Sequence, residues 1–75
     1  MIISWIDVPD SERVVAVAYN AEEEIIYVRF KKGDIEWWYG ACPPLVWEQF
    51  TGPGVSKGRF IREVLDSHPK GRLVS

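Results

Sequence analysis

The sequence has one cysteine, Cys42, and one histidine, His68. A single cysteine excludes a disulfide bond within the chain, and no group of cysteine and histidine residues has the spacing of a zinc site. No apolar run approaches the length of a membrane span, and the apolar start "MIISWIDV" is too short for the hydrophobic region of a signal peptide. These absences predict a soluble, cytoplasmic protein that uses neither a metal nor another cofactor.

Positive charge is also scarce, since nine basic and eleven acidic side chains give a net charge of −2. Residues 1–50 contain four basic and nine acidic side chains, whereas residues 51–75 contain five basic and two acidic ones. Proteins that bind nucleic acids without sequence preference usually have a strongly basic surface, because contacts to phosphate provide most of the affinity. Only the carboxyl-terminal third offers such a surface, which favours a protein partner or self-association over RNA.

The length of 75 residues suffices for one domain, because chains of this size bury only about 60% of their unfolded surface. The chain is 47% hydrophobic, and its four tryptophans supply the large buried areas that a small core needs. We predict a single domain, residues 1–75, with its core formed by residues 11–66. Residues 1–10 are expected to cover the sheet or to add an edge strand, and residues 69–75 to form a tail.

Three segments have the alternation of a β-strand. The first starts at Arg13, the second is Ile25–Phe30, and the third is Ile35–Tyr39. The loops "NAEEE" and "KKGD" connect them, which predicts an antiparallel meander. The acidic run Glu22–Glu24 is expected to be a solvated turn, since three successive carboxylates diverge and do not surround a cation.

Four-residue loops would pair Val28 with Trp37 and would place Tyr19 opposite Glu24 and Val17 opposite Ile26. On this register one face of the meander is almost entirely apolar and is expected to be the core side. It carries Val15, Val17, Ile26, Val28, Phe30, Ile35, Trp37 and Tyr39.

The opposite face carries Tyr27, Arg29 and Trp38, with Glu36 across from Arg29. Tryptophan, tyrosine and arginine are enriched at protein interfaces, so these three residues are the candidate protein-contact face. The same aromatic side chains would also suit stacking of unpaired bases, although Glu36 would repel phosphate. In a further alternative, Trp5 covers the pair and forms a second small core.

Two helices are expected after the strands. Pro43 and Pro44 suit a helix start, and Val46, Trp47 and Phe50 follow as an apolar stripe. Ser56 is a good N-cap for a second helix that extends to about Ser67. The predicted fold is therefore α+β: a three-stranded antiparallel meander with two carboxyl-terminal helices packed on one face, and optionally an extra amino-terminal edge strand.

Several short segments resemble the KTSC domain, a module found at the carboxyl terminus of some lysyl-tRNA synthetases and as small stand-alone proteins of bacteria and phages. They are Ser11, "VAYN", "VRFKKG" with Gly33, "WWYGACP", where Trp37 and Tyr39 stand in place of the family's two tyrosines, and "SKGRF" at residues 56–60. The resemblance covers residues 11–66. It implies the fold, a suggested role in RNA binding, and no catalytic site.

The start of the second helix is a candidate phosphate or RNA contact. A serine cap, free backbone amides and nearby cations can hold an anion at a helix start, although a plain capping motif is the more common use of such a serine. The candidate residues are Ser56, Lys57, Gly58, Arg59 and Arg62.

Cys42 with His68 as its base is the one candidate for nucleophilic catalysis. The sequence offers no third residue to orient that base, so we expect Cys42 to be a packing residue and His68 a helix-end residue. The chain is therefore predicted not to be an enzyme. The function ranked first is a protein-interaction or regulatory module of phage or mobile-element origin. The alternative is an accessory domain that binds single-stranded or transfer RNA.

Overall fold

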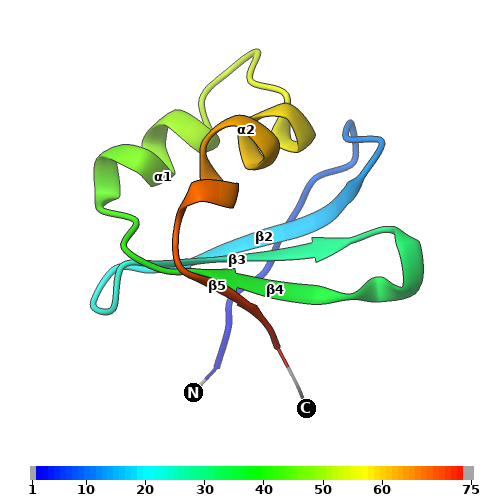
Figure 1. Ribbon diagram of the computed structural model, residues 1–75. Helices are drawn as coiled ribbons and strands as arrows, with labels where there is room; N and C mark the ends of the chain where they lie inside the picture. The colour runs from blue at the N-terminus through cyan, green and yellow to red at the C-terminus, as the bar shows by residue number, and fades with distance from the viewer. Residues whose placement is uncertain (1, 74–75) are drawn as a thin grey trace.

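The computed structural model describes residues 2–73, which form one antiparallel sheet with two short helices on one face (Figure 1). The strands are β1 (Ile6–Asp7), β2 (Val14–Asn20), β3 (Ile25–Phe30), β4 (Glu36–Tyr39) and β5 (Lys70–Arg72). The helices are α1 (Pro44–Phe50) and α2 (Lys57–Glu63), and the 3₁₀ turns are η1 (Lys32–Asp34) and η2 (Leu65–Ser67). The α+β class is confirmed, whereas the expected number of three strands is wrong. Among residues 2–73, no helix is long and apolar enough to cross a membrane.

Two strands extend the predicted meander to the order β1-β2-β3-β4-β5. The optional amino-terminal edge strand is present as β1. At the other edge, Lys70–Arg72 pairs with β4, with Trp38 opposite Gly71, although these residues were expected to lie in a tail. The backbone amide of Gly40 donates to the carbonyl of Pro69 at 2.7 Å and so begins this pairing. Residues 74 and 75 of the expected tail lie outside the described residues.

The register between β3 and β4 agrees with the prediction, since Val28 lies opposite Trp37. The register between β2 and β3 differs by two residues, because Tyr19 lies opposite Ile26 and not opposite Glu24. The loop has the expected four residues, but they are residues 21–24 and not residues 20–23, because β2 ends at Asn20 and β3 begins at Ile25. A shift of two residues keeps the side chains of residues 16–20 and 25–30 on their predicted faces of the sheet.

A β-bulge interrupts β2 between Val14 and Ala16. Val14 is fully buried in the core, while Val15 is only half-buried and lies outside it. The prediction that Val15 faces the core is therefore wrong, because an inserted residue reverses the alternation on its amino-terminal side. The carbonyl of Val15 accepts a hydrogen bond from the amide of Val8 at 2.8 Å, so β1 satisfies the bulged residue.

The core lies between the helices and the sheet, as expected. Its buried side chains are Val14, Val17, Ile26, Val28, Tyr39, Cys42, Phe50, Ile61 and Leu65. Trp47 of α1 stacks on Tyr19 of β2, with ring centroids 5.2 Å apart and planes 7° from parallel, and the ring of Phe50 lies 5.2 Å from that of Phe60. The predicted contact of α1 with the sheet is confirmed.

Both helices begin as their sequences indicate. Pro43 is extended and Pro44 is the first residue of α1, a position at which proline lacks only an amide that would be unpaired. Ser56 caps α2. The second helix is shorter than predicted, because the chain leaves α-helical geometry at Val64 and continues as η2.

Candidate functional site

The structure brings together the three residues of the predicted protein-contact face. Tyr27 of β3 lies opposite Trp38 of β4, and Arg29 lies opposite Glu36. Arg29 Nε donates to Glu36 Oε2 at 2.7 Å, and the two side chains are 30% and 33% exposed. An ion pair at this exposure contributes about 0–1 kcal/mol. Its main effect is to leave this face of the sheet nearly neutral.

Trp5 covers part of the same face, as one of the sequence alternatives expected. Its ring lies 6.4 Å from that of Tyr27 in an edge arrangement, and the guanidinium carbon of Arg29 lies 4.4 Å from the centre of the Trp5 ring. Tyr27 is therefore only 4% exposed, and burial, followed by the nearby Glu23 carboxylate, raises the pKa of its phenol. Tyr27 offers a partner little surface. Trp5, Arg29 and Trp38 remain half-buried, and together they are called the open face below.

The indole of Trp38 is held across the neighbouring strand. A Cβ atom added to Gly71 would lie 2.6 Å from Nε1 of Trp38, and one added to Gly40 would lie 3.4 Å from Cζ3. The ring therefore rests on the backbone of β5 at a position where only glycine leaves room. An aromatic ring that packs over a strand glycine is fixed in place before any partner binds, which lowers the conformational entropy lost on binding.

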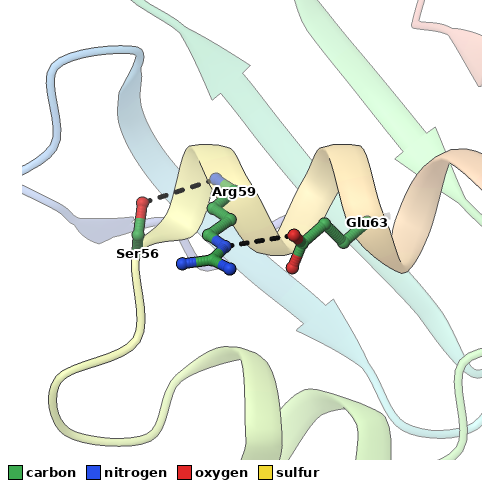
Figure 2. A network of polar contacts seen from close by, with 3 residues as sticks. All are labelled: Ser56, Arg59 and Glu63. Carbon is green, nitrogen blue, oxygen red and sulfur yellow. Dashed lines mark hydrogen bonds and ion pairs between the residues drawn. The ribbon is translucent and has the colours of Figure 1, made fainter.

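Four of the five residues predicted to bind phosphate lie at the start of α2, where most of them already have partners, and Arg62 lies in the last turn of the helix. Ser56 Oγ accepts the amide of Arg59 at 3.4 Å, and Arg59 Nε donates to Glu63 Oε2 at 3.1 Å (Figure 2). The ammonium group of Lys57 lies 5.8 Å from the centre of the Phe50 ring. Gly58 is buried, and a Cβ there would lie 3.1 Å from Cδ of Arg13. This geometry is that of a capped, closely packed helix.

These five residues line one groove of about 990 Å³ between α2, the loop before it and residues 6–13. The same groove is also lined by three carboxylates, those of Asp7, Asp10 and Glu12. Its four cations, including Arg13, are therefore nearly balanced by acidic groups. Such a mixed surface attracts a phosphate chain only weakly.

Cys42 and His68 are brought together, with Sγ 3.7 Å from Nδ1. Nδ1 also lies 3.0 Å from the carbonyl oxygen of Gly40, so it carries the proton of that hydrogen bond and has no lone pair for the thiol. Sγ itself lies near two carbonyl oxygens, at 3.3 and 3.4 Å. Burial raises the pKa of the Cys42 thiol, because the charged form would lose its solvation. The surroundings therefore stabilise the neutral thiol and not a nucleophilic thiolate.

Within residues 2–73, no three carboxylate, histidine or cysteine side chains gather in a group that could hold a metal ion. The acidic run Glu22–Glu24 is exposed.

A second cleft, of about 860 Å³, lies between the β3–β4 hairpin and α2 and was not anticipated from the sequence. We call it the hairpin cleft. Its floor consists of Phe30, Ile35, Trp37, Tyr39 and Ile61. Burial raises the pKa of Tyr39 to about 12. The strand pattern predicts that Trp37 lies wholly in the core, but its side chain is half-buried, because the helices do not extend over this end of the sheet.

Comparison with protein-family models gave no match, and comparison with curated protein sequences gave none either. Among solved structures, the chain is similar to the crystal structure of a KTSC domain protein from Yersinia pestis, with a TM-score of 0.84 and 20% identity. That similarity covers 97% of this chain and 100% of the other. The KTSC-like fold that the sequence resemblance implied is confirmed.

Proposed function

We propose that this KTSC-like fold serves as a non-catalytic binding module, and that the open face, formed by Trp5, Arg29 and Trp38, contacts a protein partner. The observation that carries the proposal is the Trp38 indole, which is half-buried and fixed across Gly71. Rigid tryptophan side chains beside an arginine are typical of the few residues that dominate the affinity of a protein interface. The absence of a catalytic role is supported by the neutral state favoured for Cys42.

The charge of the open face supports a protein partner in particular. Arg29 is paired with Glu36 and also stacks on Trp5, so no unpaired cation is left there for phosphate. Neutral aromatic surface with a satisfied ion pair resembles the centre of a protein interface, where unpaired charges are depleted.

Affinity capture with two matched variants tests the proposal. The tagged chain is cross-linked in cells that produce it and is captured after treatment with ribonuclease. Trp38→Ala removes aromatic surface from the open face, whereas Leu45→Ala removes a side chain that is 62% exposed on α1, on the other side of the sheet. We expect a co-captured protein with the native chain and with Leu45→Ala, and its loss with Trp38→Ala. Equal capture by both variants would refute a role of the open face.

The partner that contacts the open face could also be a second copy of this chain. Sedimentation equilibrium of the native chain and of Trp38→Ala measures it directly. A dimer that dissociates only in the Trp38 variant would identify the partner as a second copy of this chain.

A second candidate function is binding of single-stranded or transfer RNA, because Lys57, Arg59 and Arg62 line one groove. RNA titrations at increasing salt concentration test it, since each neutralised phosphate contributes a slope of about −0.7 in log affinity against log salt for a single strand. Arg62→Glu should then reduce the slope and the affinity. No binding at low salt would eliminate this candidate.

A further inference from the structure

The hairpin cleft exists because the two helices cover only part of the sheet. The helix α2 has seven residues and is therefore about 10 Å long, and the turn that joins β3 to β4 extends past it (Figure 1). Phe30 and Ile35 at this end of the hairpin remain half-buried. The cleft lies on the side of the sheet opposite to the open face, so any ligand there would occupy a separate site.

The floor of the cleft is apolar. Phe30, Ile35 and Ile61 have no hydrogen-bonding groups in their side chains, and the floor offers only the indole N–H of Trp37 and the hydroxyl of Tyr39. A nucleobase buried here would leave most of the donors and acceptors on its edges unpaired, which is costly. An aliphatic or aromatic amino-acid side chain has few such groups or none. The floor therefore suits an apolar side chain of a polypeptide better than a base.

The rim of the cleft is basic. Five cationic side chains line the cleft, against only Glu12 and Asp66. The cations are Arg13, Lys31, Lys32, Arg62 and Lys70. Within residues 2–73, Lys70 is the only one of these five in an ion pair, at 3.4 Å from Asp66. The chain as a whole has a net charge of −2, so this excess of cations is a local feature of the cleft.

The cations lie on both walls of the hairpin cleft. Lys31 and Lys32 are exposed on the hairpin turn, whereas Arg62 is exposed on α2, on the other wall. The side-chain stem of Arg13 packs against Gly58, with a would-be Cβ only 3.1 Å from Cδ, so Arg13 is anchored beside α2. Negative charges on both sides of a central apolar group would find a cation on each wall.

We infer that the hairpin cleft binds an acidic segment of a partner polypeptide, with one apolar side chain inserted on the floor and neighbouring carboxylates at the basic rim. The volume of about 860 Å³ lies within the range of about 300–1,000 Å³ for ligand pockets and accommodates a large side chain with its flanking backbone. Together with the open face, this site would let the domain hold two polypeptides on opposite sides of one sheet.

Selection from a random peptide library tests the inference and does not require the natural partner to be identified. The full-length native chain is immobilised as the target, and the Lys31→Glu/Lys32→Glu double variant serves for counter-selection. Both lysines are exposed on a turn, so the variant is expected to fold, and its unfolding midpoint verifies this. We expect enriched peptides to contain an aliphatic or aromatic residue between aspartates or glutamates. Their affinity should fall at least about tenfold for the double variant and should weaken with salt.

Lys57→Glu, compared with Lys32→Glu alone, is the matched charge control, because each changes the charge by two units and Lys57 lines the other groove and not the hairpin cleft. Binding of the selected peptides to Lys57→Glu should stay within about twofold of the native value, since Lys57 does not line the hairpin cleft and salt screens charges beyond it. In nuclear magnetic resonance spectra, a selected peptide should shift the indole N–H signal of Trp37 and leave that of Trp38 in place.

Three outcomes would overturn the inference. They are an enriched set without acidic residues, equal binding by the native chain and the double variant, and shifts at Trp38 in place of Trp37. If the same shifts at Trp37 arise from polyuridylate and no peptide is enriched, the ligand is a nucleic acid and the inference also fails. Trp38→Ala should retain the selected peptides, so failure of the open-face proposal and failure of this one are distinguishable.

Discussion

The packing of Trp38 over Gly71 gives a sharp test of how β5 joins the sheet. In Gly71→Ala the new methyl carbon would lie 2.6 Å from Nε1, 2.9 Å from Cε2 and 3.0 Å from Cζ2 of the indole. Heavy atoms in contact prefer a separation of about 3.5–4.0 Å. The indole must therefore move off the strand, or β5 must move away from β4.

The expected cost follows from two opposing effects. Overpacking of this kind costs about 1–3 kcal/mol. Alanine also restricts the unfolded chain more than glycine does, which offsets about 0.4–1 kcal/mol of that cost. The net loss should be about 0–2.6 kcal/mol. A domain of this size loses about 4–8 °C in melting temperature for each kcal/mol.

Urea unfolding of four chains measures the effect: the native chain, Gly71→Ala, Trp38→Ala and the double variant. In the Trp38→Ala background the alanine at position 71 meets no indole, so it should be neutral or stabilising, with a coupling of about 1 kcal/mol or more between the two positions. Gly40→Ala is the control at the other end of the same ring, where the nearest atom lies at an ordinary 3.4 Å, and it should change stability by less than about 0.5 kcal/mol. Additive effects of the two substitutions would refute the packing described for Trp38.

Three further predictions concern the core. Burial, and secondarily the Asp66 carboxylate, raises the pKa of Tyr39 from 10.0 to about 12, so the folded chain keeps this proton at pH values where the unfolded chain loses it. The free energy of unfolding should therefore be independent of Tyr39 below pH 10 and should fall by about 1.4 kcal/mol per pH unit between pH 10 and 12. In alkaline unfolding experiments, Tyr39→Phe should make this decline less steep. An unchanged slope would exclude the Tyr39 phenol as its cause. Phe50→Ala should cost about 3–5 kcal/mol in urea unfolding, because Phe50 is fully buried among other aromatic rings, and a cost near zero would contradict its central place. The Cys42 thiol should react with a disulfide reagent only as fast as the chain opens, because it is buried and its pKa is raised; reaction at the rate of a free thiol would contradict this.

The sequence predicted those parts of the fold that depend on local pattern. The pairing of β3 with β4 followed from the short loop at Gly33, which has a φ of +73°, and from the alternation of apolar residues. The bulge at Val15 was missed because "VVAV" allows either valine to face the core. Only the pairing with β1 and β3 decides between them.

The strand β5 was missed for a different reason. "KGR" has none of the β-branched or aromatic residues that mark strands, and it becomes a strand because the edge of β4 and the indole of Trp38 lie beside it. Such pairing is a tertiary effect that no local pattern encodes.

The candidate sites divide in the same way. Tyr27, Arg29 and Trp38 lie on one face because the pleat alternates side chains, and this could be deduced from the sequence. The hairpin cleft combines side chains from segments as distant as Arg13 and Lys70, so it required the packed structure. The distribution of charge between residues 1–50 and 51–75 did not indicate the hairpin cleft.

The two edges of the sheet have a consequence for how partners attach. β1 has two residues and follows a short extended segment, and β5 has three, two of them cationic. Pro9 and Pro69, which lack a backbone amide, stand close to these two strands in the sequence, Pro9 after β1 and Pro69 directly before β5. Short, charged, proline-flanked edges discourage a further strand from adding to the sheet, and they hinder the stacking of one molecule on the next into fibres. The proposed binding of polypeptides would therefore use the side chains on the two faces of the sheet, and not the backbone at its edges.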